Sequence, residues 1–120
     1  MLNLLKPEYQ HADSRRTISQ LITDNIKQVN SYQVTKGAIL GEHYHRFTNE
    51  YFYVTKGTFV VFVNEVGKKQ SMSRILNKQS FFMARSGLVH TIEALTNGEF
   101  LTFLTKPFDP KEPDLCREKP

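Results

Sequence analysis

Short runs of strand-forming residues follow one another along most of this chain, and no segment shows a convincing helical period. The clearest pair covers residues 50–54 and 58–63, which are rich in Tyr, Phe, Val and Thr and are joined by a turn that ends in Gly57. Similar runs cover 16–22, 28–35, 71–76, 80–85, 89–94 and 99–105. Eight or more short strands with turn signals between them predict an all-β sandwich or barrel.

Length and composition predict a single domain. We expect an N-terminal arm over residues 1–12, a β-barrel over 13–105 and a charged tail over 106–120 that holds four of the five prolines. The tail is predicted to be an extended strap or a disordered end. The single cysteine, Cys116, excludes an internal disulfide and lies in this tail.

The net charge of +4 comes from Lys and Arg side chains that are scattered along the sequence. This pattern favours a solvated surface, with an anionic ligand such as a nucleotide or a phosphate as the alternative. No nucleic-acid recognition motif accompanies the charge, so no nucleic-acid partner is expected. The chain shows no signal peptide and no apolar run of membrane-spanning length, which predicts a cytoplasmic protein with no membrane partner.

The segment from Gly37 to Gly57 concentrates the residues that can carry chemistry. His43 and His45 are two positions apart, so they point to the same side if this segment is a strand. Glu50 follows five residues later, and His90 could complete a set of three histidines and one glutamate. Such a nitrogen and oxygen set suits a divalent transition metal: iron, manganese, nickel, cobalt, copper or zinc. The alternative is a barrel whose histidines act as acid, base or binding groups without metal.

This spacing resembles the first motif of the cupin superfamily at every fixed position, which are Gly37, His43, His45, Glu50 and Gly57. The second cupin motif matches in part, because Gly87 and His90 fit while Arg85 and Ala94 stand where a proline and an asparagine are expected. The two motifs cover about residues 30–105. The resemblance implies a jelly-roll β-barrel of the cupin type, with the four ligands meeting inside it.

Short matches point to one group of cupins. The turn from Asp13 to Arg16, the run NSYQVTKG, the HYH segment and the FDP of the tail resemble small cupins that act on sugar nucleotides, the dTDP-4-keto-6-deoxyhexose isomerases and epimerases. The resemblance implies a histidine base, His43 or His45, and Tyr32 as the candidate acid. It also implies that Arg15 or Arg16 contacts the diphosphate, and we expect Arg85 to be either a solvated charge or an anion contact.

Three functions remain open from the sequence. The first is a cupin that binds a metal through His43, His45, Glu50 and His90. It would act on a small polar or sugar-derived molecule as an isomerase or a metal-dependent oxygenase. The second is a metal-free sugar-nucleotide ketoisomerase or epimerase with a histidine base. The third is a binding or sensing module without turnover. Cupin barrels of this size often pair, so a homodimer is expected, with the N-terminal arm as the candidate exchanged strand.

Overall fold

The computed structural model describes residues 4–111 and 115–117. Within these ranges the chain forms β-strands and no helix. The strands are β1 (Tyr9–Ala12), β2 (Thr17–Gln20), β3 (Gln28–Val34), β4 (Ile39–His45), β5 (Glu50–Lys56), β6 (Phe59–Glu65), β7 (Met72–Leu76), β8 (Phe81–Ala84), β9 (Leu88–Ala94), β10 (Gly98–Leu104) and β11 (Leu115–Arg117). The all-β prediction is confirmed, and the runs predicted at 28–35, 50–54 and 58–63 are β3, β5 and β6.

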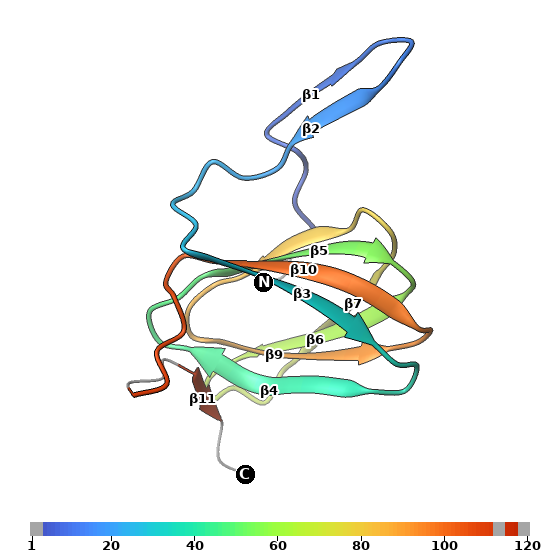
Figure 1. Ribbon diagram of the computed structural model, residues 1–120. Coiled ribbons are helices and arrows are strands. Elements are labelled where there is room, and N and C mark those ends of the chain that lie inside the picture. The colour runs from blue at the N-terminus through green and yellow to red at the C-terminus, as the bar shows by residue number, and fades with distance from the viewer. Residues whose placement is uncertain (1–3, 112–114, 118–120) are drawn as a thin grey trace.

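Two antiparallel sheets face each other and enclose the core (Figure 1). One sheet has the strand order β3-β10-β5-β8, and the other has the order β11-β4-β9-β6-β7. Alternate residues of β5 point inward, as the two-residue period requires, and these are Glu50, Phe52 and Val54. The ring of Phe52 stacks on that of Phe82 at a centroid distance of 4.6 Å. Strand alternation therefore places the one carboxylate of β5 in an apolar interior.

Strand β4 lies unusually close to its neighbour β9. Gly41 has a φ of +106°, and a Cβ atom built there would lie 2.5 Å from the backbone oxygen of His90. Any larger residue would be strained in this conformation and would also collide with the neighbouring strand. The pairing of β4 with β9 shifts register between Gly41 and His43, after which His43 faces His90. The close approach thus brings two of the predicted site histidines side by side.

Strands β1 and β2 pair with each other and form a hairpin that projects from the two sheets (Figure 1). All the residues of both strands are exposed. The chain beside the hairpin is anchored at Leu5, whose backbone nitrogen donates to Phe81 at 2.7 Å, and at Glu8, whose carboxylate accepts two hydrogen bonds from Thr23. The predicted arm therefore ends in β1, which pairs with residues that we had assigned to the barrel. The division into arm, barrel and tail stays a prediction.

The C-terminal segment returns to the barrel after β10. The backbone nitrogen of Phe108 donates a 2.8 Å hydrogen bond to the side-chain oxygen of Gln28, at the start of β3. Further along, β11 pairs with β4 and covers its outer edge beside His43 and His45. The tail is thus an extended strap over its described residues. None of the described segments is a helix with the length and apolar character needed to cross a membrane.

Candidate functional site

A cavity of about 350 Å³ lies between the two sheets. One part of its wall is apolar and is formed mainly by Phe52, Ile92 and Phe100. The polar part contains the predicted metal ligands, which are His43, His45, Glu50 and His90. The volume lies near the lower end of the ~300–1,000 Å³ range of ligand sites, which suits a molecule about the size of one sugar.

The four predicted ligands converge from three strands. β4 supplies His43 and His45, β5 supplies Glu50, and β9 supplies His90. One ligand atom from each residue can be chosen so that all four atoms lie within 4.8 Å of one another. Three of the residues are buried, and His43 is partly exposed to the cavity. The structure therefore assembles the cluster of histidines and glutamate that the sequence predicted.

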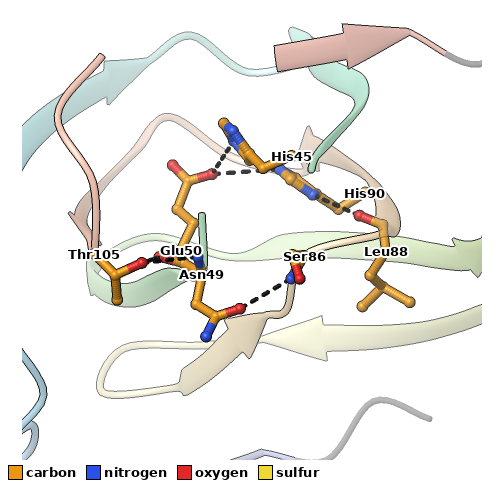
Figure 2. A network of polar contacts seen from close by, with 7 residues as sticks. All are labelled: His45, Asn49, Glu50, Ser86, Leu88, His90 and Thr105. Carbon is orange, nitrogen blue, oxygen red and sulfur yellow. Dashed lines mark hydrogen bonds and ion pairs between the residues drawn. The ribbon is translucent and has the colours of Figure 1, made fainter. Parts of the chain in front are cut away.

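Both buried histidines turn Nε2 toward the same oxygen of Glu50 (Figure 2). His45 Nε2 lies 3.3 Å from Glu50 Oε1, and His90 Nε2 lies 3.5 Å from it. The other ring nitrogen of His90, Nδ1, lies 3.2 Å from the backbone oxygen of Leu88. A carbonyl oxygen can only accept, so Nδ1 carries a proton and donates it.

This assignment leaves His90 Nε2 without a hydrogen bond in a buried site. In neutral imidazole this nitrogen would be a lone pair facing a carboxylate, which is unfavourable away from water. Two arrangements remove the conflict: a second proton on His90, or a cation held between the imidazole and Glu50. The donor set therefore fits a divalent metal, and it fits a metal-free imidazolium equally well.

Charge and burial set the protonation states of Glu50 and His43. Burial alone would raise the pKa of Glu50, but its interactions with His45 and His90 outweigh burial and lower that pKa to about 2. Burial, together with the nearby His90 and His45, lowers the pKa of His43 to about 4. At neutral pH the site therefore holds an ionised carboxylate and a neutral His43 imidazole.

Tyr32 lines the same cavity from β3. Its ring stacks on Phe100 at a centroid distance of 4.6 Å and an interplanar angle of 16°. Burial and the negative charge of Glu50 both raise the pKa of Tyr32, so the phenol keeps its proton at neutral pH. The predicted acid therefore lies in the cavity in the form that can donate.

Asn49 connects the segments next to β9 and β10 that lie around Glu50 (Figure 2). Its side-chain oxygen accepts a 2.9 Å hydrogen bond from the backbone nitrogen of Ser86, just before β9. Its backbone nitrogen donates to the hydroxyl of Thr105, just after β10. These contacts fix Glu50 relative to the loop that leads to His90.

The three predicted anion-binding arginines do not line this cavity. Arg15 and Arg16 lie at the tip of the projecting β1–β2 hairpin, where Arg15 forms an ion pair with Asp13 at 3.0 Å. Arg85 pairs with Glu65 at 2.6 Å. Their predicted contacts to substrate remain predictions, and within one chain the structure does not bring them to the histidines.

Several residues of the cavity were missed by sequence reasoning, and among them are Gln28, Asn30 and Phe108. Gln28 and Asn30 precede Tyr32 at two-residue intervals on β3, so the strand period could have placed them on the same face. Phe108 follows the last barrel strand and belongs to the FDP match in the tail, but that match did not assign it to the cavity.

A family model described as the polysaccharide biosynthesis C-terminal domain matches residues 11–116. Comparison with curated protein sequences gives no match.

Solved structures of similar fold cover nearly all of the chain. The capsular polysaccharide assembling protein CapF from Staphylococcus aureus is 24% identical with a TM-score of 0.74, and the match covers 98% of this chain but only 35% of CapF. A mutant of the 3,4-ketoisomerase QdtA from Thermoanaerobacterium thermosaccharolyticum, in complex with TDP-4-keto-6-deoxyglucose, is 17% identical over 97% of this chain and 86% of that chain, with a TM-score of 0.78. The rmlC epimerase from Mycobacterium tuberculosis is 19% identical over 91% of this chain and 65% of that chain, with a TM-score of 0.74. These likenesses confirm the predicted cupin-type jelly roll.

The pKa values of the cluster predict how stability depends on pH in chelator-treated protein. A group whose pKa is lowered by folding stabilises the folded state above its ordinary pKa, and this contribution is lost as pH falls toward the lowered value. For His43 the loss runs from pH 6.5 to about 4, and for Glu50 from pH 4.5 to about 2. We expect the free energy of unfolding to fall by about 2 kcal/mol between pH 6.5 and 4 because of His43, after a discount for its partial exposure.

Urea unfolding at several pH values measures this loss. The His43→Gln variant should lose clearly less stability than the wild type between pH 6.5 and 4. The matched control is His11→Gln, which removes an exposed histidine on β1 and should follow the wild type. Parallel pH profiles for the wild type and His43→Gln would contradict the lowered pKa of His43.

Proposed function

Because the chain belongs to the polysaccharide biosynthesis C-terminal domain family, we propose that its barrel binds a sugar nucleotide and catalyses proton transfer at a carbon next to a ketone, as an isomerase or epimerase. The observation that carries this proposal is the cavity, which holds neutral His43 and protonated Tyr32 together between the two sheets. Relatives of the same fold bind such ligands, since QdtA was solved with TDP and with TDP-4-keto-6-deoxyglucose.

His43 is the better candidate for the base. His45 and His90 both direct Nε2 at Glu50, whereas the His43 ring makes a hydrogen bond to the backbone of Gly41. That bond uses the N–H of a neutral imidazole and leaves the lone pair of the second nitrogen available. His43 is also the least buried of the three histidines, so it has the most direct access to a ligand.

The proton transfers balance within the cavity. His43 takes the proton from the carbon next to the ketone, and Tyr32 gives its proton to the ketone oxygen, which leaves a neutral enol. Return of a proton to a carbon, with the hydroxyl proton taken up by the Tyr32 oxygen, completes the isomerisation. Glu50 stays ionised and stabilises the positive charge that develops on His43.

Turnover of TDP-4-keto-6-deoxyglucose tests the proposal, with proton exchange at the carbon next to the ketone followed by NMR in D₂O. We expect the wild type to catalyse exchange, and His43→Asn or Tyr32→Phe to lower kcat by about 10²–10⁴-fold. His11→Asn is the matched control and should keep full activity. Binding of the ligand without exchange would favour a binding module, and full activity of both site variants would exclude these roles.

A second candidate function, metal binding, is favoured by one observation: the buried Nε2 of His90 that has no hydrogen-bond partner. A metal held by His43, His45, Glu50 and His90 would give this nitrogen a partner. The hydrogen bond from Nδ1 to Leu88 is the usual way in which a ligating histidine is oriented. When bound, a divalent metal would supply Lewis-acid chemistry by polarising a substrate oxygen.

Metal content and stability test this candidate in protein made without a histidine tag. We expect about one equivalent of transition metal per chain by elemental analysis, lost in Glu50→Gln. Because metal binds only the folded state, restoring it at a hundredfold excess over its Kd should stabilise chelated protein by about 2.7 kcal/mol at pH 8. The histidine-base reaction alone would be favoured by two results together. The metal-free wild type would keep full turnover, and its melting temperature would not respond to added Zn²⁺, Mn²⁺, Fe²⁺, Ni²⁺, Co²⁺ or Cu²⁺.

We also propose a homodimer in which the β1–β2 hairpin packs on a second copy. An isolated two-stranded hairpin is at best marginally stable in water, yet every residue of these strands is exposed. Gln10, Thr17 and Ser19 border a groove beside Tyr53 and Phe81 of the same chain. Strand alternation turns Tyr9 and Ile18 to the opposite face, and they are 57% and 41% exposed.

Light scattering of point variants tests the dimer. Ile18→Asp places a charge on the face that holds Tyr9 and Ile18 and should shift the protein from dimer to monomer. Ile75→Asp is the matched control, because Ile75 is 53% exposed on β7 of the other sheet. Equal masses for the wild type and both variants would refute a role for the hairpin in assembly.

A further inference from the structure

The cavity opens to solvent at one identifiable residue. Of the described residues that line it, only Phe108 is mainly exposed, at 55%, while the others are buried or half-buried. Phe108 therefore marks the mouth. Any part of a ligand too large for the barrel has to leave past its ring.

A line of side chains on β3 leads from the interior to this mouth. Tyr32, Asn30 and Gln28 point into the cavity at two-residue intervals, which spans about 14 Å along the strand. Tyr32 lies opposite the buried Phe100, whereas Gln28 pairs with Leu104 at the end of β10, where the chain turns toward Phe108. If a sugar lies beside Tyr32, the diphosphate and nucleoside attached to it thus extend past Asn30 and Gln28.

Gln28 fixes the position of Phe108. The side-chain nitrogen of Gln28 donates to the Asn30 side-chain oxygen at 3.0 Å, and its oxygen accepts from the Phe108 backbone nitrogen at 2.8 Å. Both the nitrogen and the oxygen of the Gln28 amide form hydrogen bonds, so the strap is held at a defined place beside the mouth of the cavity. Pairing of β11 with β4 holds the strap again further along.

We propose that Phe108 is the residue that binds the nucleobase, which stacks on its ring outside the barrel. This inference rests on the proposed function and adds the division of the ligand: the sugar lies inside, and the base lies on Phe108. The cavity of about 350 Å³ lies near the lower end of the range for ligand sites and suits the sugar, which places the planar base outside. An exposed phenyl ring is a platform for any base, and Gln28 is the positioning residue that holds it.

The sequence contains no tryptophan, so Phe108→Trp introduces a single fluorophore at the mouth. We expect dTDP or UDP to quench its fluorescence and pyrophosphate to leave it unchanged. The control is Phe62→Trp, because Phe62 is 41% exposed on the outer side of β6. Quenching of equal size at positions 62 and 108, or none at 108, would overturn the stacking.

Calorimetry with dTDP separates this inference from the proposed function. Phe108→Ala should weaken dTDP binding by about five- to 150-fold, the range seen when one base-stacking side chain is removed, while Phe108→Tyr keeps the affinity. Gln28→Ala should weaken dTDP binding less than Phe108→Ala does, and pyrophosphate binding should not change in any variant. If the wild type and Phe108→Ala bind dTDP equally tightly, the stacking is overturned and the proposed function is not. Wild type that binds neither dTDP nor UDP overturns both.

Discussion

A buried carboxylate determines how the strands around the site must be arranged. Glu50 is 5% exposed, and an ionised group in such a place is costly unless it has partners. His45 from β4 and His90 from β9 both approach one of its oxygens. Strands β4, β5 and β9 must therefore keep a fixed register, although β5 lies in the opposite sheet. The glycine at position 41 permits this register because it lets β4 approach the His90 backbone closely.

Local patterns predicted the strands whose residues alternate between core and solvent. Strands β5 and β10 show this alternation most clearly, and their predicted runs agree closely with the structure. The pairing of β1 with β2 and of β11 with β4 was not predicted. Strand β2 lies in the run predicted at 16–22, but all residues of β1 and β2 are exposed, so no buried face marks their pairing. Strand β11 lies in a charged, proline-rich tail, and its pairing depends on an edge of β4 that is distant in sequence.

The candidate site was predictable where spacing carries chemistry. His43 and His45 stand one strand interval apart, Glu50 follows five residues later, and His90 was the candidate that completes the set and that the cupin resemblance supports. The structure assembles all four. Arg15 and Arg16 were predicted from the resemblance to sugar-nucleotide cupins, and Arg85 as a possible anion contact. A charge finds a local partner easily, as Arg15 does in Asp13 and Arg85 in Glu65. The place of Phe108 at the cavity could not be predicted because it depends on a hydrogen bond to Gln28, eighty residues earlier.

The two candidate functions use the same nitrogen atoms in different ways. In the metal-free site His45 donates its Nε2 proton to Glu50, because an ionised carboxylate can only accept. A metal ligand must instead present a lone pair, so metal binding would displace this proton. His43 does not pair with Glu50 in this way, and its neutral ring can serve as a base only while no metal occupies its lone pair. Whether a metal occupies the cluster therefore determines whether His43 is available for proton transfer. Metal content and turnover thus both measure the equilibrium between the metal-bound and the metal-free site.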